Sequence, residues 1–70
     1  MWRILFKERY FLRQEDEWEA IQERTYVEDV EDFTPTDEEI CFFEGSHESE
    51  TDECKITVEV LAWSQFKKGA

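Results

Sequence analysis

The chain has 70 residues, a formal net charge of −11 and an aromatic content of 16 %, from three Trp, two Tyr and six Phe. This length predicts one small domain with a thin stability margin, because such a chain buries only roughly 60 % of its unfolded surface. The apolar run near the N-terminus is too short for a signal peptide, and no stretch approaches the about 20 apolar residues of a membrane span. We therefore expect a soluble cytoplasmic protein that does not associate with membranes.

The acidic residues are concentrated in the middle of the chain. Seventeen of the nineteen lie between Gln14 and Cys54, where Arg24 is the only base, so this stretch carries a formal −16. The segments before and after it carry +3 and +2. Like charges confined to a small body repel one another and lower stability. A chain that keeps them is expected to use the field that they create.

Residues 1–13 predict a strand region. Their apolar side chains alternate with basic ones, at Trp2, Ile4, Phe6, Tyr10 and Leu12. This period of two is typical of a half-buried strand. One long strand fits the pattern, and so do two short strands meeting near Lys7. The absence of Gly or Asn at that point disfavours a tight hairpin there.

Residues 14–25 favour a helix. Carboxylates would fill its first turns, where the helix dipole stabilises negative charge. Trp18, Ile21, Gln22 and Thr25 would lie on one face of this helix, at i, i+3, i+4 and i+7, where they make a thin apolar stripe. The rival interpretation is a strand that places on one face Trp18, Ala20, Gln22, Arg24 and Tyr26.

The rest of the chain predicts a connection and a hairpin. Residues 26–39 form an acidic connection interrupted by Pro35, and Thr36 with Glu39 has the spacing of a capping box that begins at most one helical turn. Residues 40–66 predict an antiparallel hairpin with arms 40–44 and 55–66, a polar loop over 45–54 and a frayed tail over 67–70. The expected fold is a small α+β domain, with an antiparallel sheet of three or four strands and one helix.

Residues that could carry catalysis are few. His47 is the only histidine and lies in the predicted loop, and neither cysteine has a partner that would activate its thiol. We therefore predict no enzymatic activity and no cofactor. Cys41, His47 and Cys54 could supply three zinc ligands, but they lack the close cysteine spacing of structural zinc sites. We expect a packed Cys41 and a solvated His47, and we assign no metal site. Cys41 and Cys54 bracket the loop, so a disulfide is an alternative, although a reducing cytosol disfavours it.

The acidic surface is the candidate site. Its residues come from the predicted helix, the connection and the loop, and we assign partner binding to Glu15, Asp16, Glu19, Glu23, Glu28, Asp29, Glu31, Asp32, Asp37, Glu38, Glu39, Glu48, Glu50 and Asp52. Carboxylates spaced like phosphates would imitate nucleic acid and compete for a basic groove. The expected partner is a basic nucleic-acid-binding protein, and direct binding to nucleic acid is not expected.

In these clusters and in its small size, the chain resembles the small acidic inhibitors that phages encode against host defence, including anti-CRISPR proteins and other DNA mimics. The resemblance lies in composition and charge layout, and no sequence motif of one family is present. It implies a protein of the host-cell cytoplasm that inhibits a host nuclease or CRISPR effector by stoichiometric binding.

The alternative is a small protein-interaction module, or a homodimer, that uses exposed aromatic side chains. Trp18, Trp63 and the Phe42–Phe43 pair are its candidate anchors, because Trp and Tyr are enriched in interface hot spots. The simpler interpretation of each aromatic residue is packing in the core.

Overall fold

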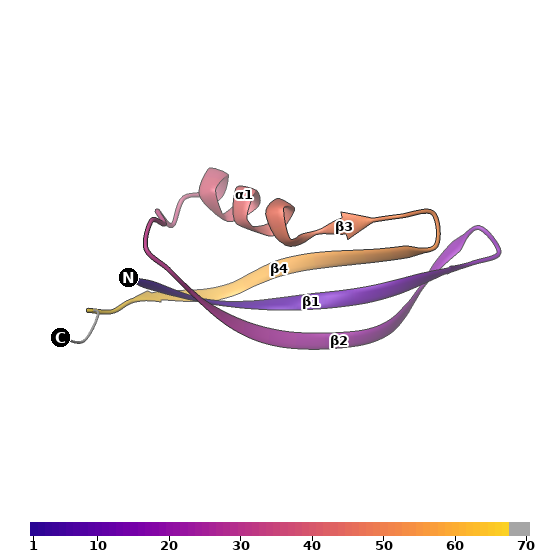
Figure 1. The fold of residues 1–70 in the computed structure, drawn as a ribbon, viewed down its shortest axis with the longest axis horizontal. Coiled ribbons are helices and arrows are strands. Elements are labelled where there is room, and N and C mark those ends of the chain that lie inside the picture. The colour runs from indigo at the N-terminus through magenta and orange to yellow at the C-terminus, as the bar shows by residue number, and fades with distance from the viewer. Residues whose placement is uncertain (68–70) are drawn as a thin grey trace.

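The computed structural model describes residues 1–67, in which a helix lies on one face of a four-stranded antiparallel sheet (Figure 1). The strands are β1 (Trp2–Gln14), β2 (Glu17–Val30), β3 (Ser49–Glu50) and β4 (Cys54–Gln65), and the helix is α1 (Asp37–His47). The strand order is β2-β1-β4-β3. The predicted α+β fold with one helix and a small antiparallel sheet is confirmed. The predicted tail lies outside the described residues, except for Lys67.

The N-terminal strand region forms one long strand at the centre of the sheet. β1 pairs with β2 from Trp2 to Gln14 and with β4 from Trp2 to Leu12. The predicted alternation is correct, because Ile4 and Phe6 are buried under α1. The odd-numbered side chains point to the opposite face, which we call the open face because α1 does not cover it.

The predicted helix over residues 14–25 is wrong, because this segment is the start of β2. β1 and β2 are joined by Glu15 and Asp16, whose φ angles are +47° and +69°. Two positive φ values in a two-residue connection make a turn whose twist matches that of the flanking strands. Asn-Gly is the usual sequence for such a turn, so the Glu15-Asp16 sequence does not predict a hairpin.

One bulge in β2 and one in β4 interrupt the alternation of side chains between the two faces of the sheet. Ile21 is the extra residue in β2, because Tyr10 pairs with Gln22 and Phe11 with Ala20. The rival strand interpretation of this segment is therefore half correct: Ala20 lies on the open face, with Trp18, and Gln22 on the helix side. Leu61 is the extra residue in β4, and it moves Ala62 to the open face and Trp63 to the helix side.

The predicted hairpin over residues 40–66 is also wrong, because its first arm and part of its loop belong to α1. Thr36 caps this helix through its Oγ1, which accepts the backbone N–H of Glu39 at 3.2 Å. The capping box therefore begins three turns instead of one. Ile40, Phe43 and His47 follow at helical spacing and face the sheet. The short run of strand-forming residues after Glu39 concealed that spacing.

The core lies between α1 and the sheet. Ile4, Phe6, Phe33 and Val58 are its buried residues. Phe6 contacts the ring of Phe43 edge-on, with centroids 5.3 Å apart. A core of this size leaves much apolar surface exposed, which is the expected situation near the lower size limit of a domain.

Two carboxylates, one from α1 and one from its C-cap residue, accept hydrogen bonds from part of the outer edge of β4. Glu48 Oε2 accepts the backbone N–H of Val58 at 2.9 Å, and Glu44 Oε2 accepts that of Val60 at 2.8 Å. β3 covers only the start of this edge, at Lys55 and Ile56. The two carboxylates therefore take the place of strand carbonyls further along β4.

The molecule is elongated. Its Cα extents are 52 × 21 × 15 Å and its radius of gyration is 14.4 Å, compared with about 11 Å for a compact domain of this length. Both hairpin turns lie at one end, and the β2–α1 connection lies at the other, near the N-terminus (Figure 1). We call these the distal and proximal ends. No helix within residues 1–67 is long and apolar enough to cross a membrane.

The turn geometry predicts a stabilising substitution. Asp16→Gly should raise the free energy of unfolding by about 0.5–1 kcal/mol, because Gly adopts positive φ without the steric penalty of a side chain. Urea unfolding measures the change. Glu17→Gly, one residue later in β2, is the matched control and should lower stability. A loss of stability in both variants would contradict the turn assignment.

The edge contact predicts a destabilising substitution. Glu44→Ala should lower the free energy of unfolding by about 1–2 kcal/mol, because the Val60 N–H loses a charged acceptor. Glu44→Gln keeps an acceptor oxygen and should lose less. Amide hydrogen exchange at Val60 should accelerate in the alanine variant only, and unchanged exchange there would exclude this contact.

Candidate partner-binding surface

The fourteen acidic residues assigned to partner binding do not form one surface. Those in β2 point alternately to the two faces of the sheet, Glu48 and Glu50 lie beside β4, and the others lie at the two ends of the molecule. Their side chains also differ in what they contact. Glu23, Glu28, Asp29 and Glu48 make the interactions described next, and Glu50 lies opposite Lys55 across β3 and β4. The remainder lie in a distal and a proximal group.

Two of these carboxylates are neutralised on the open face. Asp29 accepts two hydrogen bonds from Arg3, at 2.9 Å from Nε and 3.1 Å from Nη2. Glu23 Oε1 lies 2.9 Å from Arg9 Nε and 3.4 Å from Lys7 Nζ. The hydrogen bond from Arg9, helped by Lys7, lowers the pKa of Glu23, and Arg3 lowers the pKa of Asp29. Their charges are therefore balanced before a partner arrives.

The open face as a whole is close to neutral. The register places five basic and four acidic side chains on it, namely Arg3, Lys7, Arg9, Arg13 and Lys55 with Glu23, Asp29, Glu50 and Glu59. The formal charge of this face is +1, so the rest of the chain carries −12. Aromatic rings lie among the bases: Lys55 Nζ is 4.7 Å from the centre of the Trp18 ring, and Arg13 is also over that ring.

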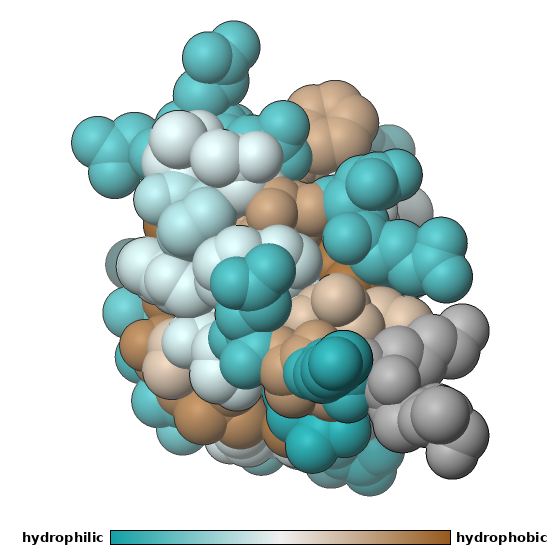
Figure 2. Space-filling view, turned by 90° about the vertical axis from the view of Figure 1, so that its left-hand side faces the viewer, coloured by the Kyte–Doolittle hydropathy of each residue, from teal (hydrophilic) through white to brown (hydrophobic). Residues whose placement is uncertain are grey.

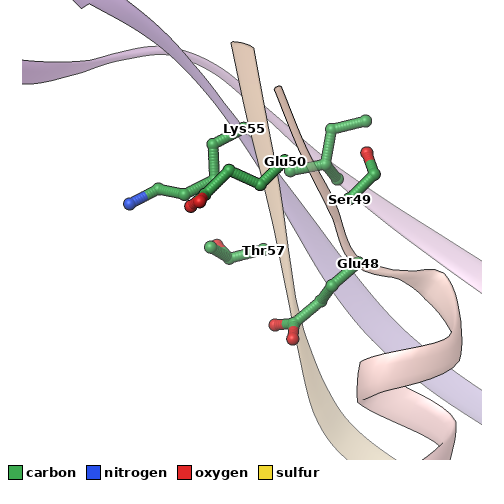
Figure 3. A pocket seen from close by; sticks show the side chains of 6 residues that line it. Glu48, Ser49, Glu50, Lys55 and Thr57 are labelled. Atoms are coloured by element: carbon green, nitrogen blue, oxygen red, sulfur yellow. The ribbon is translucent and has the colours of Figure 1, made fainter. Parts of the chain in front are cut away.

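Glu28 and Glu48 also have structural contacts. Glu28 Oε2 is 2.7 Å from His47 Nε2, and His47 Nδ1 is 2.9 Å from the carbonyl oxygen of Phe43. His47 is thus the last residue of α1, held between a carboxylate and the Phe43 ring, and the expectation that it is solvated in a loop is wrong. Glu48 points toward β4, as Figure 3 shows, and accepts the N–H of Val58.

A shallow hollow lies between β3 and β4, next to Glu48. Figure 3 shows Glu50 and Lys55 side by side across the two strands, which agrees with their pairing in the register. The remaining lining residues are Ser49, Ile56 and Thr57. The hollow is open, and its lining has two carboxylates, Glu48 and Glu50, with one ammonium group, Lys55, so its formal charge is only −1.

The distal group contains carboxylates from both hairpin turns. The backbone N–H of Arg13 donates to the carbonyl oxygen of Glu53 at 2.8 Å, which places the β3–β4 turn beside the end of β1. This contact gathers at one end Glu15, Asp16, Glu17, Glu19, Asp52 and Glu53. Arg13 and Lys55 are the bases near this end, and both lie over the Trp18 ring. Glu17 and Glu53 were absent from the assigned set, although both lie in the acidic stretch of the sequence.

The proximal group lies around the start of α1. Glu31 and Asp32 follow β2 directly, and Asp37, Glu38 and Glu39 occupy the first helical turn. Figure 2 looks at this end, where hydrophilic side chains project and hydrophobic ones show between them. Carboxylates at a helix N-terminus are stabilised by the helix dipole, typically by 0.3–1 kcal/mol each. The helix dipole therefore accounts for the carboxylates of the first turn, and no partner protein is needed to explain them.

The distal carboxylates have no comparable explanation. They lie at strand ends and turns, where no helix dipole acts on them. Because like charges gathered at a hairpin tip lower stability, the distal group is the better candidate for partner binding. Sequence reasoning could not separate the two groups, because the separation depends on which turns meet in space.

The cysteine and histidine side chains do not form a site. Cys41 lies on α1 and Cys54 is the first residue of β4, and both are exposed free thiols. The suggestion that they meet on neighbouring strands is wrong, because the first of those strands is helical. In the described part of the chain no three His, Cys, Asp or Glu side chains are grouped so as to hold a metal ion.

Two aromatic side chains are exposed as the alternative interpretation requires. Phe42 points away from the sheet and is 75 % exposed, and Trp63 is 42 % exposed beside the uncovered part of β4. Phe43 packs in the core and Trp18 is half-buried under Arg13 and Lys55, so neither is a free anchor.

Comparisons of this chain with protein-family models, with curated proteins and with solved structures find no match.

The ion pairs on the open face predict an acid dependence of stability. Glu23 and Asp29 have lowered pKa values in the folded state, so their contribution is present above their ordinary pKa values of about 4 and is lost as the pH falls through the folded-state values. Stability measured by urea unfolding should therefore decline below about pH 4. The Glu23→Gln/Asp29→Asn variant should show a flatter decline, and an unchanged decline would mean that these pairs contribute nothing.

Proposed function

We propose that the protein is a stoichiometric inhibitor that imitates nucleic acid and blocks the basic nucleic-acid-binding groove of a host effector. The observation that carries this proposal is the distal group, in which six carboxylates at and beside two hairpin turns outnumber two nearby bases, Arg13 and Lys55. A basic groove is the complementary surface. Such a protein would work by occupying the groove, and no catalytic step is needed.

The charge density of the molecule fits one strand of nucleic acid better than a duplex. A duplex carries one charge per about 1.7 Å, or roughly 30 charges over the 52 Å length of this protein. One strand carries one per about 3.4 Å, or roughly 15 over that length. The net charge of −11 is much closer to the second value. Imitation of a short stretch of one strand is therefore the form of the proposal that the magnitudes support.

The spacing of Glu17 and Glu19 supports the same form. They lie two residues apart on the helix side of β2, which corresponds to about 6.6 Å along a strand. This distance is about twice the axial spacing of phosphates along one strand of a duplex. The two carboxylates can therefore meet the cationic side chains that would contact alternate phosphates.

A protein-interaction module remains the second candidate function, and the exposure of Phe42 favours it. An aromatic side chain that points into solvent can insert into a pocket of another protein. Phe42→Ala would then weaken partner binding, whereas the acidic proposal predicts little effect of that substitution.

Removal of distal charge tests the proposal. The Glu15→Gln/Glu17→Gln/Glu19→Gln variant should bind its partner about 3 to 150 times more weakly, because exposed ion pairs contribute about 0.2–1 kcal/mol each. The matched control removes three proximal charges, Asp32→Asn/Asp37→Asn/Glu38→Gln, and should retain affinity. Equal loss in both variants would show that net charge alone matters and that the distal group is not the site.

Salt dependence tests the chemistry of the contact. Immobilised protein should capture a basic nucleic-acid-binding protein from host lysate at about 50 mM salt and release it at about 500 mM, because screening weakens exposed charge pairs. The captured protein, once purified, should lose its nucleic-acid binding at one equivalent of inhibitor. Capture that is equally strong at both salt concentrations, or captured protein that still binds nucleic acid, would exclude nucleic-acid mimicry.

A further inference from the structure

The two outer edges of the sheet are treated differently. At the β4 edge, β3 pairs with the first residues, and the carboxylates of Glu48 and Glu44 accept the next N–H groups, at Val58 and Val60. β2 forms the opposite edge, and in the strand order of residues 1–67 nothing pairs with its outer side. β2 is also one of the two longest strands, with 14 residues. A long unpaired strand is a template for a further strand.

The pairing pattern shows which backbone groups of β2 are unpaired. The N–H groups of Val58 and Val60 point away from β1, toward the helix carboxylates. Their β1 partners, Glu8 and Phe6, therefore direct their backbone groups toward β2, because hydrogen-bonded and non-bonded pairs alternate along antiparallel strands. Opposite them on β2, the backbone N–H and C=O groups of Arg24 and Tyr26 therefore point inward, toward β1.

It follows by alternation that four residues of β2 direct their N–H and C=O groups outward, namely Glu23, Thr25, Val27 and Asp29. These four residues are exposed, and Val27 is 57 % exposed. They lie between the Ile21 bulge and the end of the strand, so this stretch of the edge is regular. It offers outward-pointing donors and acceptors at every second residue.

The charge of β2 indicates which kind of strand can pair with its outer edge. The strand has five carboxylates and one base, and two further carboxylates, Glu31 and Asp32, follow it directly. A second copy pairing through β2 would bring these acidic strands together, and like charges on facing strands are destabilising. A strand that carries Lys or Arg would instead be attracted by the formal charge of −6 that β2 and these two following residues carry together. Because Glu23, Glu28 and Asp29 already have basic partners within the protein, this attraction comes from the overall field and not from new pairs with those three residues.

We propose that the outer edge of β2, at residues 23–29, binds an extended basic segment of the partner protein as a fifth antiparallel or parallel strand. Backbone hydrogen bonds to the four outward residues hold the segment, and the acidic surroundings select its charge. The inference rests on the proposed function in one respect, that the partner is basic. It adds that the contact has a backbone component, which an imitation of phosphates alone does not have.

A synthetic peptide provides the test. The probe is a fluorescent peptide of about eight residues that alternates Lys and Val, and its control carries Glu in place of Lys. In the free protein, the amides of Glu23, Thr25, Val27 and Asp29 should exchange rapidly with solvent. The Lys-Val peptide should protect all four from exchange, and the Glu-Val peptide should protect none.

Two changes separate a backbone contact from simple charge attraction. Thr25→Pro removes an outward N–H, and a Pro whose N–H would face solvent is tolerated in an edge strand. It should weaken peptide binding about tenfold, whereas Thr25→Ala keeps the N–H and should bind normally. A peptide N-methylated on alternate amides makes the same test with the unaltered protein and should also bind about tenfold more weakly.

The remaining outcomes overturn the inference in distinguishable ways. Binding that ignores Thr25→Pro and N-methylation, but is lost in the Glu15→Gln/Glu17→Gln/Glu19→Gln variant, would reject the edge site and leave the proposed function intact. Protection of the four amides without peptide, rising with protein concentration, would mean that a second copy occupies the edge. No binding of the Lys-Val peptide at low salt would reject the basic segment altogether.

Discussion

The pairing of β1 with both β2 and β4 is the interaction on which the rest of the structure depends. β1 alternates apolar and basic side chains except at Leu5, Glu8 and Phe11, so its pairing fixes two faces at once. The apolar face receives α1 and Phe33, and the basic face meets the carboxylates of β2 and β4 across the strands. A slip of one residue would reverse both faces, because strand side chains alternate with a period of two. The register of β1 therefore determines the core and the distribution of charge together.

This distribution changes the meaning of the net charge. The 17 acidic residues of the central stretch do not act as one group. Glu23 and Asp29 are balanced by β1 bases, and Glu44 and Glu48 serve as acceptors for the edge of β4. Other carboxylates stabilise the start of α1 through its dipole. What remains without a role in the fold of the described residues is the distal group, and β2 also leaves its outer backbone edge unpaired there.

The two proposals use these two features. The distal group offers charge without a fixed backbone contact, and the β2 edge offers backbone groups within an acidic surrounding. They lie on the same strand, because β2 begins at the distal turn and continues into the edge residues. A single basic partner can therefore meet both, with a cationic groove at the distal end and an extended segment along the edge. The near-neutral open face includes the side chains of the four edge residues and adds little net attraction.

Much of the fold could be predicted from the sequence, and the errors have physical causes. The β1 strand and most of β4 follow from alternation, and the fold class follows from length and apolar content. The segment of β2 was misread because the Ile21 bulge breaks its alternation and because a Glu15-Asp16 turn lacks the usual Gly. α1 was missed because Ile40 to Phe43 resembles a strand when read alone, although Thr36 signalled a cap. The roles of Glu44 and Glu48 could not be predicted, since they depend on where α1 lies against β4.

The central claim is that negative charge is displayed at the distal end and is nearly balanced on the open face. Paramagnetic relaxation of amide protons by a cationic and by an anionic nitroxide in solution measures the local surface potential most directly. The cationic probe should enhance relaxation most at residues 15–19 and 52–53, and the two probes should act almost equally at Lys7 and Arg9 on the open face. Equal potentials at the distal residues and on the open face would contradict the account.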